Sequence, residues 1–196
     1  MKAFICVYRH GIPHPRARAE TEEAARADPL LKTFLNQYFN PDCLFDWGDD
    51  PAFFAAQHLL GNERAASWGV CRPDVRRQLE AGNFVVFFCG KQNGENPKEW
   101  DYYLVGCATA KHIISRHQLW ADDQFSPYKA FYNVLARSIE GELIQSETFH
   151  PYHDDDWQRR ASASYIIFDP DPCITKINLK NPLHVARKGP NHAVEG

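Results

Sequence analysis

The chain has 196 residues and a formal net charge of −3, with 44% hydrophobic and 24% charged residues. This balance is typical of a globular domain that can build a core, and it excludes wholesale disorder. The slight negative charge excludes nucleic-acid binding through a global positive field, so any such contact needs a local basic patch. No apolar run approaches the roughly 18 residues of a membrane helix. We therefore expect no membrane partner.

The termini and cysteines indicate a location inside the cell. The opening stretch "MKAFICVYRHG" has a short apolar core and no small-residue cleavage pattern, so it predicts a strand rather than a signal peptide. The six cysteines form no CxxC pair, and three lie in apolar runs where Cys acts as a small hydrophobe. Reduced thiols in a cytoplasmic protein are the simplest interpretation.

The first third of the chain predicts one strand and three helices. After the strand over 2–8, residues 18–27 are rich in Ala, Glu and Arg and should be helical. Residues 30–40 place apolar side chains at i, i+3, i+4 and i+7, as in an amphipathic helix. A third helix should begin at Pro51, after Asp50 as its cap, and end at Gly61.

The middle of the chain predicts a short helix and two paired strands. The helix should begin at Pro73 and end at Gly82. A buried strand over 84–89 is followed by a polar loop of about ten residues and a second strand over 101–114. Because that loop has no helical pattern, we expect the two strands to be antiparallel neighbours in a curved sheet.

The last third predicts one more helix and a late strand. Residues 126–142 carry Phe131, Leu135 and Ile139 on one helical face. A strand is expected in "SASYIIFDPDP", followed by a turn and another short strand. From Asn181 the chain is polar, and its tail from about 186 should be mobile. We find no repeats or linkers, so residues 1–196 should form a single α+β domain with a mostly antiparallel sheet.

The first strand ends in Arg9-His10-Gly11, where histidine phosphatases carry a phosphorylated His and a phosphate-binding Arg. Such an enzyme also needs alternating βαβ units, a second Arg and a late His that completes the phosphate pocket. The central strands predict a hairpin instead, no second Arg motif is convincing, and the late histidines lie in polar loops: His150, His153, His184 and His192. We therefore favour the interpretation that Arg9 and His10 stand at the end of the strand and face solvent or the mouth of a pocket.

The most informative stretch is 66–114. It contains Trp68-Gly69, an Arg-bearing helix, a Gly82-Asn83 turn and two successive strands. This succession resembles the PUA-like superfamily, particularly its EVE and YTH relatives. Three segments resemble the nucleotide-modification-associated (Nmad) domains more closely: "FDWGDDPAFF" at 45–54, "FVVFFCG" at 84–90 and "YIIFDPDPCITKINLKNPLHV" at 165–185.

The resemblance implies a fold and a function. The fold is PUA-like: a mostly antiparallel curved sheet or partly closed small barrel with surrounding helices. The function is recognition of a nucleotide or modified base in nucleic acid, associated with a DNA base-modification or phage-defence system. A binding module is favoured over an enzyme, and no cofactor or metal is expected. The alternative is an enzyme acting on a nucleotide or modified base through His10, Asp49 or the 150–156 cluster.

Several side chains could hold a base between aromatic faces and test its edge with polar groups. The expected aromatic groups stand near element ends, and two small polar residues could bond the base edge: Trp68, Trp47, Phe88, Trp100 and Tyr102, with Ser67 and Asp49. Core packing is the competing interpretation for each aromatic, and at least one of Phe84, Phe87 and Phe88 must be core.

Phosphate contacts are expected from arginines around the Trp-Gly turn, because the planar guanidinium binds phosphate through two parallel hydrogen bonds. These residues are Arg64, Arg72, Arg76 and Arg77. Helical spacing places Arg72 and Arg76 on one face, with Arg77 beside them. The competing interpretation is a solvated helix face whose arginines pair with Asp74 and Glu80. The sequence does not distinguish DNA, RNA and free nucleotide, nor does it predict the oligomeric state.

Overall fold

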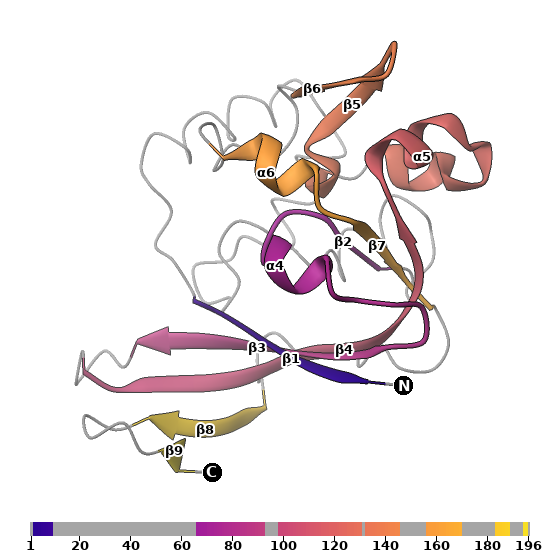
Figure 1. The fold of residues 1–196 in the computed structure, drawn as a ribbon. Helices are drawn as coiled ribbons and strands as arrows, with labels where there is room; N and C mark the ends of the chain where they lie inside the picture. Colours follow the sequence, from indigo (N-terminus) through magenta and orange to yellow (C-terminus); the bar gives the residue numbers. More distant parts are fainter. Residues whose placement is uncertain are drawn as a thin grey trace.

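The computed structural model describes residues 2–9, 66–92, 98–130, 132–145, 156–169, 183–188 and 194–195. The helices predicted over 18–27, 30–40 and 51–60 lie outside these ranges. Within them the chain forms a curved, mostly antiparallel sheet accompanied by short helices (Figure 1). This part of the chain therefore has the α+β character that the sequence predicted.

The described strands of the main sheet are β1 (Ala3–Arg9), β2 (Ser67–Trp68), β3 (Phe84–Gln92), β4 (Trp100–Ile114), β7 (Tyr165–Phe168), β8 (His184–Lys188) and β9 (Val194–Glu195). Neighbouring strands follow the order β1-β3-β4-β7-β2, and β8 pairs with β4 and β9. β1 runs parallel to β3, and the other pairs are antiparallel.

The hairpin of β3 and β4 confirms the antiparallel pairing predicted for the two central strands. Phe84 pairs with Thr109 at one end, and Gln92 pairs with Trp100 at the other. β4 continues past this hairpin, so that its last residues pair with β7 instead. The long strand bends between these two partners, which curves the sheet around its inner face (Figure 1).

The core fills the inner face of this curved sheet. Val85 and Phe87 point inward from β3 and are fully buried. They pack against α4 (Pro73–Arg76) and the turn after it through Val75 and Leu79. The remaining buried members of the cluster are Cys6, Ala66, Trp68, Ala108, Ala110, Ile166 and Phe168. Burial thus alternates along β3, and its buried side chains define the covered face of the sheet.

The helix predicted over 126–142 is wrong. The chain there forms the 3-10 helices η1 (Asp123–Ala130) and η2 (Tyr132–Val134), then a hairpin of β5 (Ala136–Ile139) and β6 (Glu142–Gln145). Leu135 has a φ of 67°, which no right-handed helix can accommodate. Glu140 and Gly141 also have positive φ, as the tight turn of a two-residue hairpin requires.

Two short helices were not predicted. α5 (Arg116–Ala121) begins with a capping box in which Ser115 and Gln118 exchange hydrogen bonds. The Ser-x-x-Gln spacing was therefore a readable signal. α6 (Trp157–Ala161) begins after Asp156. Among the helices that the structure describes, none is long and apolar enough to cross a membrane.

The chain near its C-terminus contributes two strands, β8 and β9, where the sequence predicted polar residues without a strand. β8 pairs with the first residues of β4, from Trp100 opposite Lys188 to Tyr103 opposite His184. β9 then pairs with β8. His184 therefore lies in a strand rather than in a polar loop, and this places a titratable group against the sheet.

Candidate functional site

The structure describes eight of the eleven residues predicted for the site. Trp47, Asp49 and Arg64 lie outside the described residues, as does His10 of the opening motif. The remaining residues separate into three environments, namely the core, a face of basic side chains and the outer face of the sheet.

Trp68 lies in the core, so the expectation that it lines an open base pocket needs correction. Its side chain is 1% exposed and meets the Phe87 ring edge-on at 5.0 Å between centroids. The cause is β2, a two-residue strand that pairs with β7 and turns Trp68 into the sheet interior. The indole N–H has no hydrogen-bond partner among the described groups, which leaves a buried donor unsatisfied.

Ser67 also has a structural role instead of the predicted contact with a base edge. Its Oγ donates to Asn133 Oδ1 at 3.3 Å and accepts a bond from the Tyr165 hydroxyl at 2.8 Å. The Asn133 amide in turn donates to the Ser67 carbonyl at 3.1 Å. All three side chains are fully buried. This network joins β2, η2 and β7 and satisfies polar groups that would be costly to bury alone.

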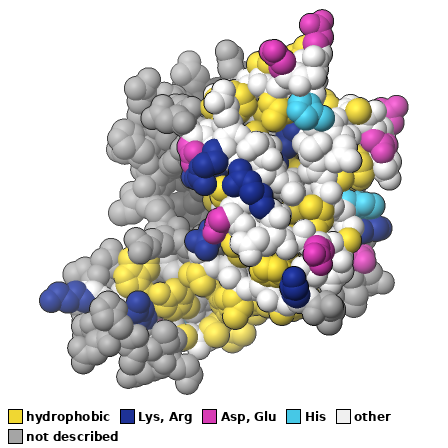
Figure 2. All heavy atoms as spheres, viewed as in Figure 1, with side chains coloured by type: hydrophobic (Ala, Val, Ile, Leu, Met, Phe, Trp, Pro, Cys, Tyr) yellow, Lys and Arg dark blue, Asp and Glu magenta, His cyan; other side chains and the backbone are white. Residues whose placement is uncertain are grey.

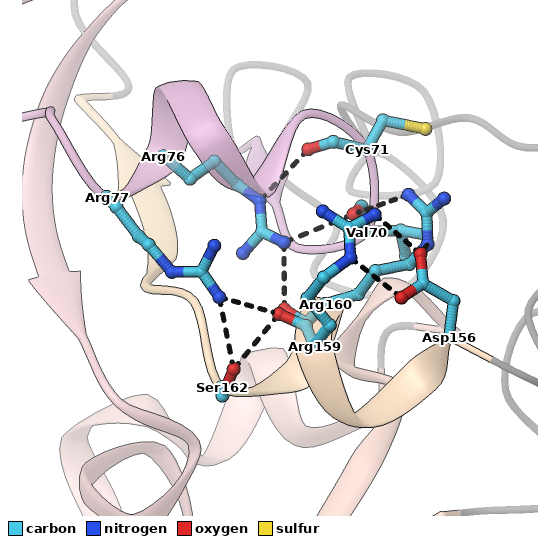
Figure 3. Close-up of polar contacts among 8 residues, drawn as sticks. All are labelled: Val70, Cys71, Arg76, Arg77, Asp156, Arg159, Arg160 and Ser162. Carbon is cyan, nitrogen blue, oxygen red and sulfur yellow. Dashed lines mark hydrogen bonds and ion pairs between the residues drawn. The ribbon is translucent and has the colours of Figure 1, made fainter.

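Arg76 likewise does not lie at a pocket rim. Its guanidinium is fully buried, and Nε donates to the Cys71 carbonyl at 3.0 Å. Its Nη atoms donate to the backbone carbonyls of Val70 and Arg160 (Figure 3) and to two further carbonyls, those of Ala163 and Ser164. Because α4 is only four residues long, the spacing argument that placed Arg72 and Arg76 on one exposed face does not hold.

A group of arginines does gather on the surface over α4 and α6, and we call Arg72, Arg77, Arg159 and Arg160 the arginine face. Arg77 donates to the Arg159 carbonyl at 3.0 Å and to Ser162 Oγ at 3.2 Å (Figure 3). Sequence reasoning found Arg72 and Arg77 and missed Arg159 and Arg160. The missed pair follows the 150–156 cluster in the chain and lies in α6, a helix that the sequence did not predict.

Two aspartates partly neutralise the arginine face. Asp156 accepts from Arg159 Nε at 2.7 Å, and it lies 3.4 Å from Arg160 Nε. Asp74 lies 3.7 Å from Arg72. Four guanidiniums against two carboxylates leave a net positive charge, and Figure 2 shows basic side chains gathered over α4 and α6. Such a surface suits phosphate groups, which guanidinium forks bind bidentately.

The predicted aromatics Phe88, Trp100 and Tyr102 lie together on the other side of the sheet. Phe88 follows the inward-pointing Phe87 and therefore points outward. Tyr102 pairs directly with Gly90, and directly paired residues project to the same face. Trp100 lies two positions before Tyr102 on the same strand. We call the surface formed by Phe88, Gly90, Trp100 and Tyr102 the outer sheet face.

Gly90 allows two rings to converge on the outer sheet face. A Cβ at this glycine would lie 3.1 Å from Tyr102 Cε1 and 3.5 Å from Trp100 Cε3. The rings therefore occupy the space above the backbone where a larger residue would stand. A glycine within an apolar strand often marks such a close approach, and this was the signal that sequence reasoning left unused.

Among the side chains that the structure describes, those around the outer sheet face are apolar apart from a lysine. Val7 of β1 pairs with Phe88 and is 39% exposed, and Ile5 beside it is 70% exposed. Lys188 of β8 pairs with Trp100. Figure 2 shows apolar side chains over the part of the sheet formed by β3 and β4, and basic side chains above them over α4 and α6.

On the inner face near β8, Arg187 and His184 contact the carboxylate of Asp101, and the sequence did not reveal this cluster. Asp101 is 8% exposed and accepts from Arg187 Nε at 2.8 Å. His184 Nε2 lies 3.0 Å from the same carboxylate oxygen, and the Tyr103 ring meets the imidazole edge-on. The bond from Arg187 lowers the pKa of Asp101 most; burial opposes this, and the bond from His184 lowers the pKa further.

This cluster predicts a stability change at acid pH. The pKa of Asp101 is lowered in the folded state, so its ionised form contributes stability above the unfolded pKa of about 3.9. That contribution disappears as the pH falls through the lower folded pKa. We expect Asp101→Asn to cost about 1–3 kcal/mol at neutral pH. Urea unfolding of the wild type and Asp101→Asn from neutral to acid pH should show the difference between their free energies of unfolding shrinking towards zero. A constant difference would contradict the role assigned to the Asp101 carboxylate.

No group of three or more His, Cys, Asp or Glu side chains that could hold a metal occurs among the described residues. The acidic stretch 150–155 lies outside them. Comparisons of the chain with protein-family models, curated proteins and solved structures found no match. Function must therefore be argued from the arginine face and the outer sheet face themselves.

Proposed function

We propose that the protein recognises a nucleotide or modified base in nucleic acid, with the base stacked on the outer sheet face. The observation that carries this proposal is the convergence of Trp100 and Tyr102 over Gly90, beside Lys188. The aromatic rings provide stacking surfaces, and the lysine provides a cation for the attached phosphate. From the sequence resemblance, we also propose that the protein acts in a DNA base-modification or phage-defence system.

The physics of stacking supports a sheet face as the binding surface. Each base that stacks on an aromatic ring gains about 1–3 kcal/mol, whatever its identity. Four-stranded sheets in RNA-binding domains use outward aromatics in this way. Partly exposed rings on a rigid strand need little ordering when a base arrives, so most of the stacking energy contributes to binding. Discrimination of a modified base then depends on contacts at its edge.

The arginine face supplies the electrostatic part of the proposal. Arg72 and Arg159 have side chains about half exposed, at 48% and 53%. Phosphates that bind there would release counterions, and affinity would fall as salt rises. This contribution is independent of base identity. Affinity and base recognition are thus assigned to different side chains, which allows them to be tested separately.

Replacing a ring on the outer sheet face tests the proposal. We expect Tyr102→Leu to weaken oligonucleotide binding by about 1–3 kcal/mol, or roughly 5- to 150-fold. Tyr102→Phe should bind like the wild type, because it keeps the ring. Fluorescence anisotropy with labelled oligonucleotides carrying unmodified and modified bases measures both effects.

The matched control is Tyr128→Leu, which removes a half-buried tyrosine from η1, outside both surfaces. It should leave binding unchanged. Thermal melting of all three variants establishes that each is folded at the assay temperature. Equal affinity of wild type and Tyr102→Leu, or no binding to any oligonucleotide, would refute the proposed function.

A second candidate function is the enzyme alternative, and the Asp101–His184 pair is the observation that favours it. A buried carboxylate bonded to one ring nitrogen fixes the tautomer and orientation of an imidazole, as in general base catalysis. His184 is exposed, so its second nitrogen could accept a proton from a bound substrate. Turnover of modified nucleotides that Asp101→Asn and His184→Gln both abolish would establish this alternative.

A further inference from the structure

We propose that the outer sheet face binds single-stranded nucleic acid through at least two neighbouring unpaired bases, and not a duplex or an isolated nucleotide. This inference rests on the proposed function and names its substrate class. It follows from how the rings are distributed over two strands, from their position on the face of a sheet and from the charges of the described residues around them.

The aromatic surface extends over several register positions. Phe88 pairs with Leu104, four residues along β4 from Trp100, which corresponds to about 14 Å at the strand rise of about 3.4 Å per residue, and Tyr102 lies between them. Phe88 extends the set onto the neighbouring strand, next to the register position of Tyr102. The converging rings of Trp100 and Tyr102 and the ring of Phe88 can therefore stack with different bases.

The sheet face requires unpaired bases. In a duplex, adjacent base pairs stack about 3.4 Å apart and cover each other's faces, so a protein surface reaches only edges and phosphates. Rings that lie on a sheet can stack only on bases whose faces are uncovered. Single-stranded segments, loops and ends provide such bases, and proteins commonly bind them on aromatic side chains.

The charges around the face agree with a polyanion whose bases face inward. Lys188 pairs with Trp100 at the border of the face. The described residues that share this face by strand register include no acidic side chain: Ala3, Ile5, Val7, Phe84, Val86, Phe88, Gly90, Trp100, Tyr102, Leu104, Cys107, Thr109, Ala186 and Lys188. Among these described residues, a phosphate beside the stacked bases therefore meets a cation and no carboxylate.

The test compares one mixed sequence as single-stranded DNA, single-stranded RNA and duplex, together with its mononucleotides. We expect the single strands to bind at least about tenfold more tightly than the duplex and the mononucleotides. Trp100→Leu and Tyr102→Leu should each lower single-strand affinity by roughly 5- to 150-fold and leave residual duplex binding unchanged. The DNA and RNA results identify which strand chemistry is preferred.

Three outcomes would overturn this inference. Duplex binding as tight as single-strand binding would assign affinity to phosphate contacts, such as those of the arginine face. Mononucleotide binding as tight as oligonucleotide binding would keep the proposed function but require a site for one base. A wild-type dimer that Tyr102→Leu dissociates in analytical ultracentrifugation, with no oligonucleotide binding, would make this face a contact between two copies of the chain and would end both proposals.

Discussion

Gly69→Ala should destabilise the fold by about 3–4 kcal/mol, one of the two largest effects that we expect. A Cβ at this position would lie 2.0 Å from the backbone oxygen of Asn133 and 2.8 Å from Tyr165 Cε2. Neither neighbour can move freely, because both belong to the buried network with Ser67. The Gly69 carbonyl also accepts a bond from the buried Arg116. A shift of this backbone would therefore disturb two sets of buried hydrogen bonds.

Gly82→Ala is the matched control. Gly82 has a φ of 83° but open space around its Cβ position, so only backbone strain opposes the substitution. We expect a cost of about 1 kcal/mol there. Urea unfolding monitored by circular dichroism compares the two variants with the wild type. If both substitutions lowered the free energy of unfolding equally, the close contact between the new Cβ at position 69 and the Asn133 oxygen would relax without a measurable cost.

Much of the sheet could be predicted because its strands carry their own signals. The apolar run of β3 predicted a buried strand with at least one of Phe84, Phe87 and Phe88 in the core, and Phe87 is that residue. The short polar loop after β3 favoured an antiparallel neighbour. The hairpin of β5 and β6 escaped prediction because its apolar residues also fit a helical period. Its turn depends on the positive φ values of Glu140 and Gly141, which the helical pattern concealed.

The candidate site was predicted less well than the fold, because residue type does not reveal the direction of a side chain. Trp68 and Trp100 are equally suited to stacking, but one follows a strand into the core and the other lies on the opposite face. The difference depends on the pairing of β2 with β7, a contact between segments about one hundred residues apart. The spacing of apolar residues within one segment cannot predict its pairing with a distant segment.

One feature of the outer sheet face was readable in the sequence. Trp100 and Tyr102 alternate with the buried Asp101, so a strand assignment alone places both rings on one face. Gly90 then marks the position on the neighbouring strand where large rings can approach the backbone. The register that brings these residues together had to come from the structure, because the β3–β4 pairing contains a bulge after Phe87.

The neighbouring residues Arg76 and Arg77 should differ sharply when each is replaced by Met. Arg76→Met removes the donors to five buried or partly buried backbone carbonyls that hold α4 against α6 and β7. Met fills a similar volume but donates no hydrogen bond, so each carbonyl loses a partner at a cost of about 1–3 kcal/mol, reduced where water can reach it. We expect Arg76→Met to lose about 3–5 kcal/mol of stability, measured by urea unfolding.

Arg77→Met tests the opposite role one residue along the chain. Arg77 is exposed and donates to the Arg159 carbonyl and to Ser162, so its loss should cost less than about 1 kcal/mol of stability. Because it belongs to the arginine face, we expect it to weaken oligonucleotide binding and to flatten the dependence of affinity on salt. Arg137→Met, an exposed substitution on β5, controls for the loss of one positive charge. If Arg76→Met were stable and bound oligonucleotides weakly while Arg77→Met unfolded, the two roles would be reversed. The arginine face would then include Arg76 in place of Arg77.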